Sequence, residues 1–288
     1  MNIKFKFIYT ICIIMQNILI LDNDECLGYF GLLNGIYNGC IRILFHNRLH
    51  NNGIDIDILN EFNTIFTDLS IELLNAGYAR KGLTPFFENI KKLKSHGHIH
   101  KVVMMTSNYR YIKNKYMGYF DWVKTIRTIF EKYANIDTQF PTISIYDLDY
   151  SCRTDEVNAI VTKDKATKKV ISKIIDKLQI TDYTTINKIV CIDDRIKNID
   201  FDDIFDIVRV ILQPVRSYYS LISKTLFYTI INKYEERLLS LHINSFKDIC
   251  ILNYNHDVIE MGIHGNKLFT NIKNDSDLDI DLYEIFNK

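Results

Sequence analysis

The sequence predicts an α/β protein built on a doubly wound parallel sheet, with a small helical insert and a helical C-terminal extension. Two observations carry this prediction: apolar segments at 18–21 and 189–192 each run directly into a pair of acids, and helical periodicity recurs between such segments. Ligands of open α/β sheets bind outside the carboxyl ends of the strands. The acids that end these segments are therefore expected at the functional edge of the sheet.

The bulk composition narrows the class of protein and of partner. The 288 residues suffice for a substantial core, and 35 basic residues balance 35 acidic ones, so no net field draws the chain to nucleic acid or an anionic membrane. A local basic patch, and with it a nucleic-acid partner, stays open. The six cysteines include no C-x-x-C pair, which favours reduced thiols in an intracellular, cytoplasmic protein.

Residues 1–14 are expected to be an N-terminal extension. Lys4 and Lys6 precede an apolar run as in a signal sequence, but no small-x-small cleavage site follows, and the run continues into the first strand. The apolar stretch is also short for a membrane span and is interrupted by Thr10. We therefore expect neither secretion nor a membrane anchor, and Met15 is an alternative start.

The predicted core covers residues 15–215. Its first strand ends at Asp22, and the Gly- and Asn-rich stretch 27–39 that follows is typical of a loop or hairpin. Apolar residues at three-to-four spacing then predict an amphipathic helix over 55–76. The region 27–80 is thus expected to be a small insert with one helix, which leaves the site partly open.

The remaining segments alternate between strand and helix, as in a doubly wound sheet. Thr84 and Pro85 open a helix in the manner of an N-cap and a first-turn proline. In chain order the patterns predict a helix over 84–96, a strand over 101–108, a helix over 119–135, a strand over 142–150, a helix over 165–178, a strand over 188–194 and a strand over 207–214. Residues 216–288 are predicted to form a helical extension, clearest over 220–242, that passes into an Asn- and Asp-rich tail.

Four polar features follow the predicted strands in order. They are Asp22 with Asp24, Thr106 with Ser107, a lysine-rich segment over 163–169, and Asp193 with Asp194. An Asp-x-Asp pair alone also occurs in turn caps and calcium loops, so the first feature by itself decides little. With all four in this order, the chain resembles the haloacid dehalogenase-like (HAD) superfamily, whose core is Rossmann-like.

Within that superfamily the resemblance is specific at the two acidic motifs. LDNDECLG is similar to the LDLDETLG of the C-terminal-domain phosphatases, and LTPFF with KVVMMTSN resembles their next block. The runs LDNDECLGYFGLLNGIY and VCIDDRIKNI are similar to phosphatase-like proteins of large DNA viruses, a family of predicted hydrolases. The resemblance covers roughly residues 15–215 and stops before the extension. A phosphoprotein substrate is implied by it alone.

The resemblance implies a role for each polar strand end. Asp22 is the expected nucleophile, because a carboxylate that attacks phosphorus splits one displacement into two easier steps. Asp24 is expected to protonate the leaving oxygen and then to deprotonate the attacking water. Thr106 is expected to bind a phosphoryl oxygen, with Ser107 as the alternative in register.

A lysine is expected to neutralise the phosphate and the carboxylates, which otherwise repel each other. Lys163, Lys165, Lys168 and Lys169 all stand near the predicted helix start. We favour Lys168, because KKVISKII matches the family's K-x-h-h-x-x-h-h, and Lys163 is the second choice. Each of these lysines also suits a solvated helix face.

The acids also suit a metal site. Mg²⁺ accepts one or two carboxylates together with phosphate and water in octahedral geometry. The resemblance implies Asp22, the backbone carbonyl of Asp24 and the pair Asp193 and Asp194 as its surroundings. Asp194 is the expected direct ligand and Asp193 the supporting one, with the reverse assignment open. The same acids would also suit the N-terminus of the next helix.

Two residues depart from the family pattern. Asn23 stands where leucine is usual, and Cys26 where threonine or valine is usual. Cys26 is similar in size but oxidisable and a weak donor, so a weak or redox-sensitive enzyme is an open alternative. His96, His98 and His100 would bind zinc only if a strand aligned them, and their position before a strand favours a solvated turn.

The leading prediction is a Mg²⁺-dependent phosphatase that acts through an aspartyl-phosphate on a phosphorylated protein or small molecule. One alternative is a polynucleotide-end or small-molecule phosphatase with the same chemistry. Another is a catalytically weak HAD-like binding module whose C-terminal helices recruit a partner. The sequence does not define the oligomeric state.

Overall fold

A parallel sheet organises the protein. A computed structural model describes residues 15–23, 25–49, 56–106, 122–133, 142–144, 169–200, 204, 207–218, 220–268, 278 and 280–287. Within these residues, a five-stranded sheet has the order β3-β2-β1-β5-β7, and all of its pairs are parallel. The predicted α/β fold with a parallel sheet is thereby confirmed.

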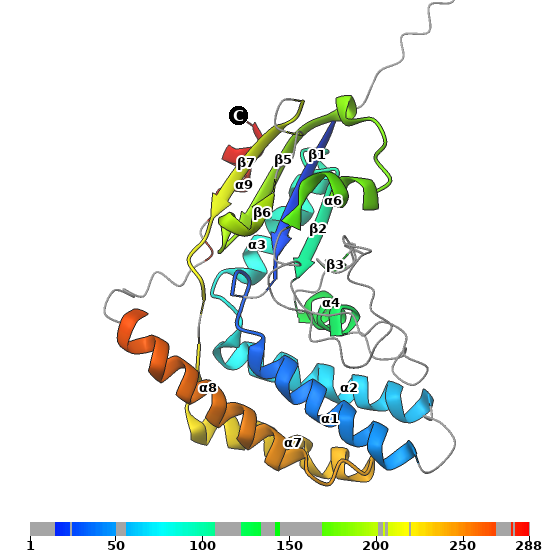
Figure 1. Cartoon of the computed structure of the whole chain (residues 1–288), viewed down its shortest axis with the longest axis vertical. Helices are drawn as coiled ribbons and strands as arrows, with labels where there is room; N and C mark the ends of the chain where they lie inside the picture. Colours follow the sequence, from blue (N-terminus) through cyan, green and yellow to red (C-terminus); the bar gives the residue numbers. More distant parts are fainter. Residues whose placement is uncertain are drawn as a thin grey trace, which may run out of the picture.

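Strands and helices are distributed along the whole described part of the chain (Figure 1). The strands are β1 (Gln16–Asp22), β2 (Lys101–Thr106), β3 (Thr142–Ser144), β4 (Lys169–Val170), β5 (Ile186–Asp193), β6 (Ile199–Asp200) and β7 (Arg209–Pro214). The α-helices are α1 (Gly31–Leu49), α2 (Ile56–Leu73), α3 (Leu83–Ser95), α4 (Trp122–Tyr133), α6 (Ile171–Lys177), α7 (Lys224–Ser240), α8 (Phe246–Leu268) and α9 (Leu282–Asn287). Short helical turns are η1 (Leu74–Tyr78), η3 (Tyr183–Thr185) and η4 (Ile196–Asn198).

Both faces of the sheet are covered, because its strands are apolar on both sides. Leu19 and Leu21 of β1 belong to one buried apolar cluster, whereas Ile18 and Ile20 belong to a second one. The first cluster includes residues of α3 and α4, and the second includes residues of α6. Figure 1 accordingly shows α3 and α6 on opposite faces of the sheet. This two-sided burial explains why β1 and β5 are near-continuous apolar runs.

The chain changes direction across the sheet between β1 and β5. From β1 it continues to β2 and β3 on one side, and β5 and β7 then extend the sheet on the other side. Such a reversal of strand order creates a crevice at the carboxyl ends of the two central strands. The ends of β1 and β5 are therefore the structural candidates for a site.

The segment after β1 differs from its prediction. The glycine-rich stretch 27–39, expected to be a loop or hairpin, enters helix α1 at Gly31, so the insert contains two long helices instead of one. A Cβ atom on Gly39 would lie 2.6 Å from a methyl carbon of Ile249 in α8. Glycine in α1 thus allows close helix packing and does not mark a turn.

The C-terminal extension packs on the insert instead of standing apart. α8 contacts α1, and α7 contacts α2, so these four helices form one layer beyond the carboxyl ends of the strands (Figure 1). The extension was predicted to be helical, but its part beyond residue 242, where α8 lies, was expected to be an Asn- and Asp-rich tail. The layer shares one continuous apolar core with the sheet face that α3 covers.

Aromatic side chains fill the junction between this helical layer and α4. The ring of Tyr37 in α1 lies 5.2 Å from that of Phe66 in α2 and 5.3 Å from that of Trp122 in α4. The Thr125 hydroxyl donates a hydrogen bond to the Tyr37 hydroxyl at 3.2 Å. Aromatic contacts of this kind contribute beyond their area of burial, and they fix α1, α2 and α4 against one another.

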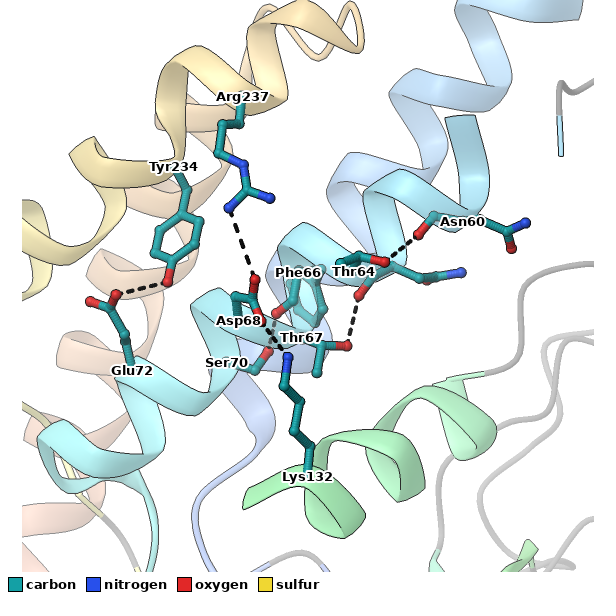
Figure 2. Close-up of polar contacts among 11 residues, drawn as sticks. Asn60, Thr64, Phe66, Thr67, Asp68, Ser70, Glu72, Lys132, Tyr234 and Arg237 are labelled. Atoms are coloured by element: carbon teal, nitrogen blue, oxygen red, sulfur yellow. Dashed lines mark hydrogen bonds and ion pairs between the residues drawn. The ribbon is translucent and has the colours of Figure 1, made fainter. Parts of the chain in front are cut away.

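Asp68 and Glu72 of α2, here called the seam, make polar contacts with the neighbouring helices α4 and α7 (Figure 2). Asp68 pairs with Lys132 of α4 at 2.7 Å and lies 3.9 Å from Arg237 of α7. One turn further on, Glu72 accepts hydrogen bonds from Lys233 at 2.7 Å and from the Tyr234 hydroxyl at 2.8 Å. The insert is therefore tied to both the core and the extension by charged contacts.

The close packing of α1 on α8 can be tested with a double-mutant cycle. Gly39→Ala should lower the free energy of unfolding by about 1 kcal/mol, because overpacking against Ile249 outweighs the gain in helix propensity. Adding Ile249→Ala removes the crowded methyl groups, so the double variant should be more stable than the sum of the single changes predicts. Urea denaturation measures each value. Additive effects would show that the two helices are not in tight contact here.

The seam predicts a dependence of stability on pH. The hydrogen bond from Lys233 is the main cause that holds the pKa of Glu72 below its ordinary value of 4.5. Because the pKa of Glu72 is lowered in the folded state, its carboxylate stabilises the fold at pH values above 4.5. This stabilisation is lost as the pH falls through the folded-state pKa. Glu72→Gln should therefore cost about 0.5 kcal/mol at pH 7, since the pair is exposed, and almost nothing at pH 3.

Chemical denaturation at both pH values measures this difference, and Glu236→Gln, at an exposed glutamate of α7, is the matched control. The control variant should show no such difference. An equal cost of Glu72→Gln at pH 7 and pH 3 would contradict an electrostatic role.

Candidate functional site

Strand pairing brings the two acidic motifs together. Leu21 of β1 pairs with Ile192 of β5, so Asp22 and Asp193, the next residues, end neighbouring strands side by side. Asp194 follows directly, and one carboxylate oxygen from each of these three residues lies within 4.8 Å of the others. Among the described residues, no other group of at least three His, Cys, Asp or Glu converges in this way. Three oxygens at this spacing suit the ligation of a single cation.

The acids are almost fully removed from solvent. Asp22 is 6 % exposed and Asp193 2 % exposed, and one oxygen of Asp193 accepts a 2.6 Å hydrogen bond from the Arg195 backbone N–H. Buried carboxylates are costly unless cations or hydrogen-bond donors compensate their charge. The electrostatics of the site therefore favour a positive ligand.

Asp194, the second acid of the late motif, contacts two polar side chains. The Ser217 hydroxyl donates a hydrogen bond to Oδ2 of Asp194, and Nε of Arg195 lies 3.5 Å from the same oxygen. Arg195 also pairs with Glu25 at 2.6 Å. The late acidic motif is thus connected to the turn that follows β1.

A buried arginine joins three segments next to this motif. Arg80 donates through one nitrogen to the backbone carbonyls of Glu25, at 2.9 Å, and of Arg216. Its guanidinium lies 5.3 Å from the centre of the Tyr218 ring. Burial lowers the pKa of Arg80, while nearby Asp194 acts in the opposite direction. An arginine stays charged under such conditions, so Arg80 provides a permanent positive charge close to the acids.

Asn23, between the two acids of the first motif, lies in an unusual environment. Its side chain is completely buried, and within the described part of the chain neither the amide nitrogen nor the amide oxygen has a hydrogen-bond partner. Its backbone N–H donates to the Met105 carbonyl at 3.0 Å, which fixes the loop to β2. An unpaired buried amide destabilises a folded protein. Cys26, the other departure from the family pattern, is also buried, with Sγ 3.8 Å from the Ile192 carbonyl oxygen.

Several predicted site residues lie outside the described residues. These are Asp24, Ser107, Lys163, Lys165 and Lys168. Of Thr106, the backbone ends β2 one position beyond the residue that pairs with Asp22, so it lies at the same edge of the sheet. The structure therefore unites Asp22, Asp193 and Asp194 and leaves the other assignments as predictions.

The secondary structure of the lysine-rich segment differs from the prediction. A helix was expected over 165–178, but Lys169 and Val170 form strand β4, and α6 begins at Ile171. β4 pairs with β6, which follows the late acidic motif. Val170 is β-branched and suits this strand pairing, and the tertiary contact with β6 overrides the local helical periodicity.

Two residues near the acids were missed by sequence reasoning. Ser217 and Arg80 lie outside every predicted motif, and neither has a local pattern that indicates a role. Their positions next to Asp194 arise from the fold, which brings together the ends of β5, β7 and the insert. The three described histidines, by contrast, do not come together as a group that could hold a metal, and Nδ1 of His100 accepts a hydrogen bond from the Asn17 backbone N–H.

No protein-family model, curated protein or solved structure matches the chain. Within the part of the chain that the structure describes, the helices are too short or too polar to cross a membrane.

The unpaired amide of Asn23 generates a testable prediction. Asn23→Leu should raise the free energy of unfolding by about 1 kcal/mol, because an apolar side chain replaces a buried amide without partners. Asn17→Leu, on the strand that precedes Asn23, is the matched control, since the Asn17 amide donates to the His98 carbonyl and accepts from Asn187. The control variant should be destabilised. Loss of stability in both variants would mean that the Asn23 amide has a partner in solution.

Proposed function

We propose that the protein is a Mg²⁺-dependent phosphatase that forms an aspartyl-phosphate on Asp22. The observation that carries this proposal is the convergence of Asp22, Asp193 and Asp194 at the ends of two neighbouring parallel strands. These three acids come from motifs separated by about 170 residues, and their convergence at a point of strand-order reversal is typical of a ligand site.

The reaction on these residues takes two steps. A carboxylate oxygen of Asp22 attacks the phosphorus of a phosphate monoester, and the bond from phosphorus to the leaving oxygen breaks as Asp24 donates a proton to that oxygen. Water then attacks the phosphorus of the aspartyl-phosphate, Asp24 takes its proton, and the bond to Asp22 breaks. Inorganic phosphate leaves, and both acids return to their original state.

The acids fit the expected cation. Asp22, Asp193 and Asp194 would hold Mg²⁺, because the ion prefers hard oxygen ligands and accepts carboxylates together with water and phosphate. When bound, Mg²⁺ offsets the negative charge that the acids and the phosphate would otherwise bring together. Arg80 contributes a second, fixed positive charge near Asp194.

The helical layer bears on the substrate class. The family resemblance implies a phosphoprotein substrate, and the insert with one helix that the sequence predicted would have left the site open to a macromolecule. Instead α1, α2, α7 and α8 together occupy the space beyond the carboxyl ends of the strands (Figure 1). The insert is therefore not the small one that would leave the site open to a macromolecule, and we propose a phosphomonoesterase without restriction to phosphoprotein.

Hydrolysis of para-nitrophenyl phosphate tests the proposal. The wild-type protein should release phosphate only with Mg²⁺, and Asp22→Asn should reduce kcat at least about 10³-fold, because the nucleophile is removed. Asp248→Asn, which alters an exposed acid in the first turn of α8, is the matched control and should retain full activity. Circular dichroism should show that all three proteins are folded.

The proposal also has clear contrary outcomes. Equal rates for wild type and Asp22→Asn would exclude Asp22 as the nucleophile. Binding of Mg²⁺ without hydrolysis of any phosphate ester would instead favour the binding module that the sequence left open. Hydrolysis of nucleotides or sugar phosphates but not of phosphopeptides would assign a small-molecule substrate.

A further inference from the structure

We propose that Ser217 is a positioning residue for the metal site, and that it selects which oxygen of Asp194 faces the cation. The inference rests on the proposed metal-dependent function. It concerns the segment after β7, which none of the predicted motifs includes. Ser217 touches neither the substrate nor the cation in this proposal, and it acts through Asp194.

The polar contacts of Asp194 are one-sided. The Ser217 hydroxyl and Nε of Arg195 both approach Oδ2, and among the described residues no hydrogen bond or ion pair to Oδ1 occurs. The Asp194 side chain is only 3 % exposed, so solvent does not compete strongly for its oxygens. With Oδ2 hydrogen-bonded to Ser217 and paired with Arg195, Oδ1 is left for the cation. Hydrogen bonds from outside the coordination sphere orient metal ligands in this way.

Ser217 itself is held on both sides by backbone contacts. The Val215 N–H donates to the Asp193 carbonyl at 3.1 Å, and the Tyr218 N–H donates to the Glu25 carbonyl at 2.6 Å. These bonds fix the segment to the end of β5 and to the turn after β1. A hydroxyl on a segment anchored at both acidic motifs can impose a defined orientation on Asp194.

Buried Arg80 strengthens this anchoring. Its guanidinium donates to the carbonyl of Arg216, the residue before Ser217, and it packs on the ring of Tyr218, the residue after it. The Tyr218 hydroxyl in turn donates to the carbonyls of Gly77, at 2.7 Å, and Ala79, at 3.2 Å. The position of Ser217 is therefore determined by three segments at once.

Calorimetric titration with Mg²⁺, and separately with Mn²⁺, tests the inference on the full-length protein. Ser217→Ala should raise the dissociation constant of both ions at least about tenfold, as is usual when a ligand loses its supporting hydrogen bond. Ser217→Thr keeps the hydroxyl and should stay within about threefold of wild type. Ser240→Ala removes a serine hydroxyl that donates to the Arg237 carbonyl in α7, and it should leave metal binding unchanged.

Kinetics provide a second readout. Loss of a serine with a purely structural role would not change the Mg²⁺ requirement alone. With para-nitrophenyl phosphate, Ser217→Ala should require about tenfold more Mg²⁺ for half-maximal rate, whereas kcat at saturating Mg²⁺ should remain within about threefold of wild type. The thermal unfolding temperature without added metal should change little, because one hydroxyl is removed and its partner keeps Arg195.

The outcomes separate this inference from the proposed function. If wild type binds neither ion, the metal-dependent function itself is wrong. If wild type binds and Ser217→Ala binds equally well, only the positioning role fails. A Ser217→Thr variant as weak as Ser217→Ala would also overturn it, because the hydroxyl would then not be the active feature.

Discussion

The parallel pairing of β1 with β5 is the constraint on which the site depends. Their register places Asp22 beside Asp193, and adjacent strands lie only about 4.8 Å apart. Two buried carboxylates at neighbouring strand ends repel each other, so this edge is an unfavourable feature of an otherwise well-packed sheet. The apolar clusters on both faces provide the stability that offsets it. The acids are thus held together by packing that they do not themselves provide.

The sheet and the convergence of the acids can be predicted from the sequence, because both follow from local patterns. The apolar runs that lead to Asp22 and Asp193 are buried on both faces, so composition alone identifies them as central strands. Parallel topology then requires their carboxyl ends to share one edge. Helices with a clear apolar stripe, such as α2, were predicted for the same reason, since their periodicity reflects a single buried face.

The helical layer cannot be predicted in this way, because its contacts join residues about 200 positions apart. Gly39 resembles a turn residue until Ile249 of α8 is known to pack against it. α8 carries many polar residues among its apolar ones, so its sequence resembles a tail. Likewise, the local sequence around Ser217 does not indicate a role, because its hydrogen bond to Asp194 forms only in the folded protein. Local propensity does not contain tertiary information of this kind.

The helical layer and the acidic site are connected to the core in the same region, here called the base of the layer, around Gly28, Ala79 and Arg80. The insert leaves and rejoins the core at an antiparallel bridge between Gly28 and Ala79, and Tyr218 donates to the carbonyl of Ala79. Arg80, the next residue, reaches the turn after β1 and the segment that carries Ser217. Because a ligand stabilises whichever arrangement it binds best, the proposed cation would also stabilise the base of the layer if it required this orientation of Asp194. Linkage is reciprocal, so contacts that hold the helices at this base would contribute to the affinity of the acids for the proposed cation.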